Sequence, residues 1–318
     1  MATAFGVAAS LGIGAAQINS GLHSVFGLPM GNAWQAGIIL VVTLLFMASA
    51  VSGVERGIKW LSQANLLAAI LLAMAVFFLG PTVAILDTFS NTLGSYLSEV
   101  VRMSLRLTPF RDSDWIGGWT IFYWAGWISW SPFVGLFIAR ISKGRTIREF
   151  LFGVVIVPTL VGFIWFSVFG GTALNMQIFQ GAQLTYVATK DSSLALFEVL
   201  NRLPLSAVTS VVATLLVVIF FVTSGDSATL VLATMSQNPA PPNRSKILWG
   251  ILVSGIALAL MMAGGLKAVQ TAVIVFALPF ALVLSLMALA LLRAVRRDWK
   301  DEQRQQREWR RKMRTLVQ

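Results

Sequence analysis

The chain has 318 residues, of which 57% are hydrophobic and only 12% charged. Soluble globular domains carry about 25% charged residues, so this composition, with a mean hydropathy of +0.77, excludes an ordinary soluble domain. Cysteine is absent, which excludes disulfides and thiolate metal sites. The single histidine, His23, disfavours a histidine-dependent metal site or catalytic triad. No apolar run contains a carboxylate pair or a nucleophile with its base, so we do not expect an enzyme.

Apolar runs of membrane length recur along the chain. Runs of about 20 such residues are typical of helices that cross a bilayer, which predicts an all-α integral membrane protein with about eight transmembrane helices. The predicted spans lie near residues 3–22, 35–53, 60–80, 118–139, 150–170, 206–232, 247–265 and 269–292. A further helix over about 91–107 has an apolar stripe beside charged residues. We expect it to lie at the membrane interface and not across the bilayer.

Basic residues in the loops set the predicted orientation. Lys and Arg occur between spans two and three, four and five, and six and seven, and again after span eight. All four positions fall on one side of the membrane, and the positive-inside rule makes that side cytoplasmic. The sequence therefore predicts a multi-pass protein of the cell inner membrane with a cytoplasmic C-terminus.

The span at 118–139 is unusually aromatic. Trp127 and Trp130 lie one turn apart, with Trp124 one turn before them and Phe133 and Phe137 after them. Positions i, i+3 and i+7 share a helix face, and aromatic faces attract a quaternary ammonium group. An aromatic belt is the alternative, but a belt belongs at helix ends, whereas these rings continue through the middle. Trp124, Trp127, Trp130 and Phe133 are therefore predicted to bind substrate.

Two aromatic residues at the edges of this run are candidates for a gate or a pathway. Phe137 continues the ladder toward the basic loop, and Trp119 begins it at the outer end. For Trp119, a gate and an interfacial belt both remain open.

Polar side chains interrupt span six. Thr223 and Ser224 place hydroxyl oxygens in an otherwise apolar helix, and hydroxyl and carbonyl oxygens suit a hard monovalent ion such as Na⁺. Asp226 follows, and a carboxyl group in a span is a functional candidate. It could equally cap a neighbouring helix near the cytoplasmic interface, so its role stays open.

The segment 293–318 is predicted to be a basic cytoplasmic helix. It has ten Lys or Arg, four Asp or Glu and no Gly or Pro, giving a net charge of +6. Such a segment is attracted to an anionic membrane leaflet, although topology-setting charge is an alternative reading. Nucleic-acid binding fits poorly for a helix fixed to the membrane. Candidate regulatory residues are Arg296, Arg297, Arg310 and Arg311.

Four stretches, at 5–14, 118–135, 137–150 and 221–227, together resemble the betaine/carnitine/choline transporter family. The resemblance implies a leucine-transporter-like fold of two inverted five-helix repeats in a protein of usually twelve spans. This chain matches the last eight, so we expect an N-terminally truncated form, a fragment of a longer protein. The implied transmembrane domain is 1–292, with a partial first repeat at 1–80 and a complete second repeat at 118–292.

The resemblance also implies site roles. Trp127 completes an aromatic box around the ammonium group, and Trp130 lines the inward path. Two departures matter: Val7 replaces a second hydroxyl expected four residues after Thr3, and Gly126 stands where a tryptophan is common. The implied Na⁺ ligands are Thr3 and Phe133 at one site, and Phe220, Thr223 and Ser224 at the other.

The resulting functional expectation is secondary active uptake of a quaternary-ammonium compatible solute, above all glycine betaine, coupled to Na⁺. Choline or carnitine transport with proton coupling or exchange is one alternative. A non-transporting osmosensory fragment is another. We expect no cofactor besides Na⁺ as the coupling ion. The expected partners are a small-molecule substrate and membrane lipids, with a homo-oligomer left open.

Overall fold

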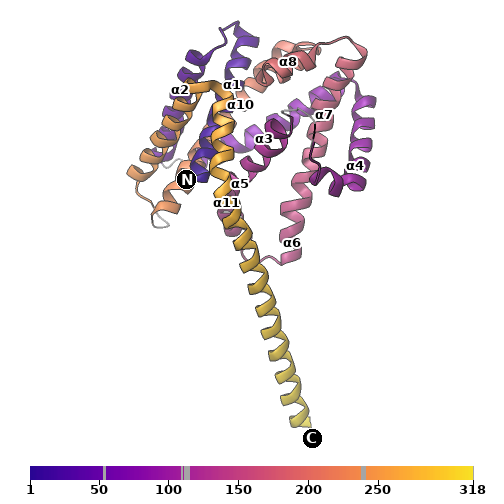
Figure 1. The fold of residues 1–318 in the computed structure, drawn as a ribbon, viewed down its shortest axis with the longest axis vertical. Helices are drawn as coiled ribbons and strands as arrows, with labels where there is room; N and C mark the ends of the chain where they lie inside the picture. The colour runs from indigo at the N-terminus through magenta and orange to yellow at the C-terminus, as the bar shows by residue number, and fades with distance from the viewer. Residues whose placement is uncertain (53–54, 109, 111–114, 238–240, 318) are drawn as a thin grey trace.

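The computed structural model is helical along the chain, and no strand occurs among the residues it describes (Figure 1). It describes residues 1–317 apart from 53–54, 109, 111–114 and 238–240. For residues 55–58, 140, 308 and 310–317 it describes the backbone alone. The prediction of an all-α protein is confirmed. The helices are α1 (Ala2–Phe26), α2 (Asn32–Ser52), α3 (Glu55–Leu79), α4 (Thr82–Ser104), η1 (Ile116–Ile121), α5 (Phe122–Ile141), α6 (Ile147–Leu151), η2 (Phe152–Ile156), α7 (Val157–Phe179), α8 (Leu184–Lys190), η3 (Ser192–Leu194), α9 (Ala195–Asn201), α10 (Ser206–Ser236) and α11 (Asn243–Val317).

Within the described part of the chain, six helical segments are long and apolar enough to cross a membrane. The last of them, in α11, contains two of the predicted spans. A kink separates these two spans, because the backbone leaves helical geometry at Gly264 and Gly265. Gly265 has φ 60°, in the left-handed region that favours glycine. The remaining predicted span is α1, which has membrane length but carries more glycine and polar residues. The described parts of all eight predicted runs thus lie in helices, apart from run ends at Gly80, Gly264 and Gly265.

Helix α1 lies at the centre of the larger apolar core. It packs against α2, α5, α10 and α11, and most of its residues are buried. Its small residues permit this close packing: a Cβ at Gly14 would meet the ring of Phe221, and one at Gly21 would meet Thr214. Close approach through small residues is typical of helix pairs in membranes. The polar and glycine-rich composition of α1 therefore reflects its central position.

A second core joins α3, α7 and α10 with the short helices α8 and α9. Ala69, Leu72 and Val76 of α3 share this cluster with Ala213 and Leu216 of α10. Their spacing of three and four residues is that of one helix face. Helix α10 thus contributes to both cores, with α3 on one side and α1 and α2 on another.

Helix α4 occupies the region where an interfacial helix was predicted near 91–107. It begins earlier, at Thr82, directly after Pro81, and ends at Ser104. It packs mainly against α7, where the rings of Tyr96 and Phe163 meet edge to face with centroids 5.1 Å apart. Its position relative to the bilayer stays a prediction.

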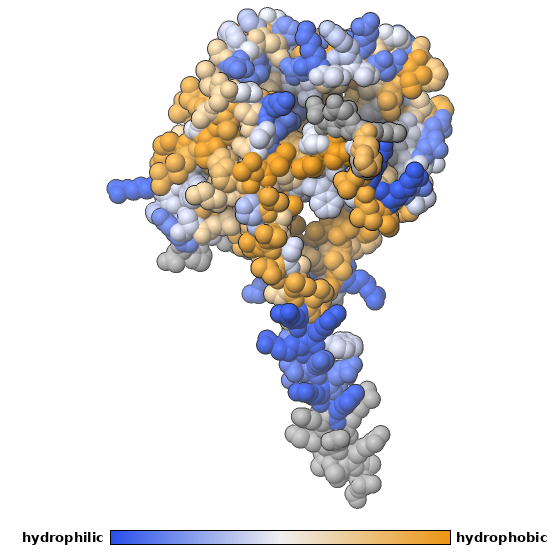
Figure 2. Space-filling view, in the orientation of Figure 1, coloured by the Kyte–Doolittle hydropathy of each residue, from blue (hydrophilic) through white to orange (hydrophobic). Residues whose placement is uncertain are grey.

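The C-terminal part of α11 projects from the bundle as a single long helix (Figure 1). Its surface changes from hydrophobic to hydrophilic along its length (Figure 2). Arg296 and Arg297 are exposed there. Arg310 and Arg311 belong to the same helix, but their side chains lie outside those that the structure describes.

Candidate solute and ion sites

The aromatic helix α5 is shaped by the sequence Trp130-Ser131-Pro132. Proline has no backbone N–H, so Pro132 leaves the carbonyl of Ile128 without its usual helical donor. The hydroxyl of Ser131 replaces that donor, since its Oγ lies 2.7 Å from the Ile128 carbonyl oxygen. The helix therefore continues through the proline to Ile141. The side chains of the aromatic ladder consequently stand on one continuous helix.

One face of α5 is fixed against α1. Ser129 is fully buried, and its side chain lies where a Cβ on Gly6 would stand. The indole Nε1 of Trp130 donates to the Gly6 carbonyl oxygen at 3.3 Å and to Ser10 Oγ at 3.2 Å. The Trp130 ring also meets Phe133 edge to face, with centroids 5.1 Å apart. Trp130 and Phe133 thus join α5 to the core.

The other predicted aromatic residues, Trp119 on η1 and the rest on α5, are turned outward. Trp127 is 73% exposed and Trp124 61% exposed, and Trp119 and Phe137 are also exposed. Trp119 stacks on Tyr123 with ring centroids 5.9 Å apart. The ladder therefore divides into two parts. Trp130 and Phe133 support the helix, whereas the indole faces of Trp124 and Trp127 are available to a ligand or another segment.

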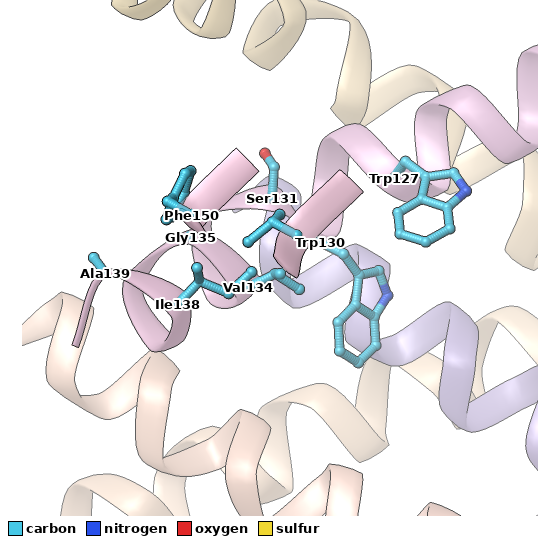
Figure 3. Close-up of a pocket in the computed structure, with 9 residues that line it drawn as sticks. Trp127, Trp130, Ser131, Val134, Gly135, Ile138, Ala139 and Phe150 are labelled. Atoms are coloured by element: carbon cyan, nitrogen blue, oxygen red, sulfur yellow. The ribbon is translucent and has the colours of Figure 1, made fainter. Parts of the chain in front are cut away.

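Trp127 and Trp130 both line an apolar cavity of about 330 Å³ (Figure 3). Figure 3 shows their indole rings as neighbours along α5. Phe150 and Val154, from α6 and η2, were not predicted as site residues and complete the wall. Phe150 ends the stretch 137–150 that carries the family resemblance, and the capping box of Thr146 and Glu149 starts α6 beside it. The remaining lining residues are Ser131, Val134, Gly135, Ile138 and Ala139.

The predicted ligands of the first Na⁺ site lie on two helices that pack together, α1 and α5. Thr3 is buried on α1, and Phe133 packs against the same core. Val7, the departure noted in the sequence, is buried in that core as an apolar side chain. At the first predicted site, Thr3 therefore supplies one hydroxyl group, and the apolar side chain of Val7 supplies none.

The predicted ligands of the second site lie on α10. Phe220 is half exposed and Ser224 is exposed. Thr223 Oγ1 donates to the carbonyl oxygen of Ile219 at 2.8 Å and to that of Phe220 at 3.2 Å. Because the hydroxyl proton is directed along the helix, the lone pairs of the Thr223 oxygen remain free to accept. Such an oxygen can coordinate a cation.

Asp226 lies one turn further along α10 and is partly buried. The backbone carbonyl of Asp226 accepts from Thr229 Oγ1 at 2.9 Å. Lys246 of α11 acts electrostatically on its carboxyl group, and Lys246 Nζ donates to the Ala50 carbonyl oxygen at 3.2 Å. Lys246 thus joins the start of α11 to the end of α2, whereas Asp226 lies ten residues before the end of α10. The role of Asp226 stays a prediction.

No group of three or more His, Cys, Asp or Glu that could hold a metal ion occurs in the described part of the chain. His23 is exposed at the end of α1, with its Nδ1 2.8 Å from the Leu28 carbonyl oxygen.

An all-helical bundle with several membrane-length helices and an aromatic face on a proline-containing helix defines a multi-pass membrane protein. A family model described as the betaine/carnitine/choline family transporter matches residues 1–300. The chain belongs to this family of transporters. The resemblance predicted from the sequence is confirmed.

Three curated relatives show how the chain compares with named transporters. The glycine betaine transporter OpuD of Bacillus subtilis is 47% identical over 306 residues, covering 94% of this chain and 59% of the relative. The ectoine/hydroxyectoine transporter of Virgibacillus pantothenticus is 44% identical and covers 92% and 59%. The glycine betaine transporter of Acinetobacter baylyi is 43% identical and covers 93% and 45%. The chain therefore spans about half the length of these relatives.

Proposed function

We propose that this chain takes part in secondary active uptake of a quaternary-ammonium solute, above all glycine betaine, coupled to Na⁺. The observation that carries the proposal is the outward-facing pair of indoles at Trp124 and Trp127. A trimethylammonium group cannot donate a hydrogen bond, and the negative face of an indole ring attracts it electrostatically. Relatives named as glycine betaine transporters support this choice of substrate.

A second substrate class has its own support. Nothing lies within 4 Å of a Cβ built at Gly126, so the surface beside Trp127 has room for a solute of another shape. A relative at 44% identity is named an ectoine/hydroxyectoine transporter. Competition by ectoine, choline and carnitine against labelled glycine betaine therefore belongs in the functional test. Choline or carnitine transport with proton coupling, or by exchange, is the alternative mechanism.

The ion proposal rests mainly on α10. Val7 removes one hydroxyl from the α1 region, whereas Thr223 and Ser224 supply two adjacent hydroxyl groups. A hard monovalent cation prefers such oxygen ligands. A membrane potential of 100 mV supplies about 2.3 kcal/mol for each charge that enters. Inward movement of Na⁺ can thus drive accumulation of the solute.

The direct test is uptake of radiolabelled glycine betaine by proteoliposomes that contain the protein expressed from its own gene. With an inward Na⁺ gradient, uptake is expected to be well above that of empty liposomes. With K⁺ in place of Na⁺ at equal ionic strength, uptake is expected to stay at the level of empty liposomes. Uptake that follows a proton gradient without Na⁺ would select the alternative mechanism. Absence of uptake with every ion and solute would favour the non-transporting, osmosensory role.

We further propose that the tail senses ionic conditions. It has a net charge of +6 over residues 293–318 and begins where the apolar part of α11 ends (Figure 2). On the proposed cytoplasmic side it would bind an anionic leaflet, with each basic residue contributing about 1 kcal/mol. Raised internal salt would weaken this attraction, because the Debye length falls from about 10 Å at 0.1 M to about 3 Å at 1 M. Release of the tail would then change the transport rate.

Deletion of residues 296–318 is expected to leave uptake present but insensitive to osmolality. The reason is that the deletion removes Arg296, Arg297 and the charged segment after them while keeping the apolar part of α11. Uptake would be measured against external osmolality in liposomes with anionic lipid, and in neutral liposomes as the control. A normal osmotic activation curve after the deletion would reduce the tail to a topology signal.

A further inference from the structure

The cavity beside Trp127 extends along α5 toward the end of that helix. Its lining on α5 runs from Trp127 to Ala139, which is about 18 Å along the helix axis at 1.5 Å per residue. Ser131, Gly135 and Ala139 lie four residues apart and so share one face of the helix. A Cβ built at Gly135 has nothing within 4 Å. These small side chains therefore leave an apolar passage from the exposed indole toward the basic loop after α5.

Phe150 supplies the bulky side chain on the opposite wall of this cavity. In 147–157, a range that the structure describes in full, only Phe150 and Val154 are partly buried, and the other residues are exposed. The two lie four residues apart on one helix face, and both line the cavity. In Figure 3 the Phe150 ring lies toward the Gly135 end of the row of lining residues, and Trp127 lies at the other end. The ring thus stands across the passage from the small side chains.

The backbone that carries Phe150 is fixed by its surroundings. The chain turns back after α5 at Gly144, which has φ 83°, in the left-handed region that favours glycine. Thr146 N donates to Glu149 Oε2 at 2.9 Å, and Glu149 N donates to Thr146 Oγ1 at 3.3 Å. Phe150 N then donates to the Thr146 carbonyl oxygen at 3.0 Å. With its backbone held in this way, the ring leaves the cavity by rotation about its side-chain bonds.

We propose that Phe150 closes the inward end of this cavity and controls release of the solute from Trp127. The inference rests on the binding of a quaternary-ammonium solute at Trp127 proposed above. An apolar constriction blocks a pore by excluding water, and a charged solute does not pass it while the ring is in place. Phe137, the aromatic residue predicted for the pathway, is 57% exposed and lies outside the lining of this cavity. Phe150 is the ring that stands in the passage.

The test uses a single introduced thiol, because the chain has no cysteine. Ser131→Cys places the thiol in the cavity between Trp127 and Ala139. The probe is a methanethiosulfonate reagent that carries a trimethylammonium group, added to inside-out membrane vesicles that contain the protein expressed from its own gene. Adding Phe150→Ala to Ser131→Cys is expected to raise the rate of thiol modification at least about tenfold, since an apolar ring no longer excludes the charged reagent.

Three further variants make the result specific. Phe152→Ala is the matched control, because Phe152 is 60% exposed and lies outside the cavity lining, and it is expected to leave the rate unchanged. Phe150→Leu keeps an apolar side chain and is expected to raise the rate less than Phe150→Ala does. Gly135→Leu fills the passage from the opposite wall and is expected to lower the rate. This change of opposite sign gives a result even if Phe150→Ala fails to fold.

Binding and release are separated by a second measurement. The dissociation constant of labelled glycine betaine is expected to be the same for Phe150→Ala and the parent, because the ring acts on release and not on the bound solute. The rate of uptake is expected to change, since opening of such a barrier can limit turnover.

The outcomes separate this inference from the proposed function. If the thiol reacts at equal rates with Phe150→Ala, with Gly135→Leu and without either change, the role of Phe150 is overturned and uptake by the parent still stands. Weaker binding of glycine betaine by Phe150→Ala would make Phe150 a binding residue and would also overturn its role in release. If the parent neither binds nor transports any of the solutes, the proposed function fails, and the release role of Phe150 fails with it.

Discussion

Replacement of Trp127 by leucine is expected to raise the dissociation constant for glycine betaine by between about ten and one hundred fold. A desolvated cation–π contact contributes about 2 kcal/mol, and each 1.4 kcal/mol is about tenfold in affinity. Leucine keeps an apolar side chain but removes the aromatic quadrupole. The measurement is equilibrium binding of radiolabelled glycine betaine to the purified protein expressed from its own gene.

Trp60→Leu is the matched control for this change. Trp60 of α3 is 70% exposed, close to the 73% of Trp127, but it lies on a different helix. It is expected to leave the dissociation constant unchanged. Equal binding by the parent and Trp127→Leu would remove Trp127 from the solute site. Equal losses in the two tryptophan variants would indicate a general effect of replacing an exposed indole.

The double change Thr223→Ala with Ser224→Ala is expected to raise the Na⁺ concentration for half-maximal uptake at least about tenfold. Each hydroxyl that is removed takes away an oxygen of the proposed cation site, and contacts to a charged group contribute about 1.5–3 kcal/mol each. Protein abundance is expected to change less, since Ser224 is exposed. Uptake measured as a function of Na⁺, beside quantification of the protein in the membrane, provides the test.

Thr234→Ala controls for the loss of a helical threonine. Thr234 Oγ1 donates to the Leu230 carbonyl oxygen at 2.8 Å, the same distance as from Thr223 Oγ1 to the Ile219 carbonyl oxygen. The control variant is expected to keep the Na⁺ dependence of the parent. Should the double variant also keep it, the cation does not bind at this turn of α10, and the assignment of Thr223 and Ser224 is wrong.

The aromatic ladder shows how far helix periodicity can take a site prediction. Spacing alone placed Trp127 and Trp130 one turn apart on the same helix, and in the structure both line the same cavity. Spacing did not show that the two side chains have different surroundings. Trp130 donates its indole proton to α1 through Gly6 and Ser10, whereas Trp127 is turned outward. That division depends on which side of α5 faces α1, and a local pattern does not contain this information.

The amino-acid sequence by itself determined the all-helical membrane class, the helical runs, the aromatic character of α5 and the hydroxyl groups of α10. These follow from composition and from periodicity within single helices, which are local properties of the chain. The tertiary structure alone decided that Phe150 joins the cavity of Trp127 and that Trp130 donates to Gly6 and Ser10 of α1. Such contacts depend on how separate helices pack. The register between helices is set by small residues such as Gly14 against Phe221, through close packing of side chains far apart in the chain.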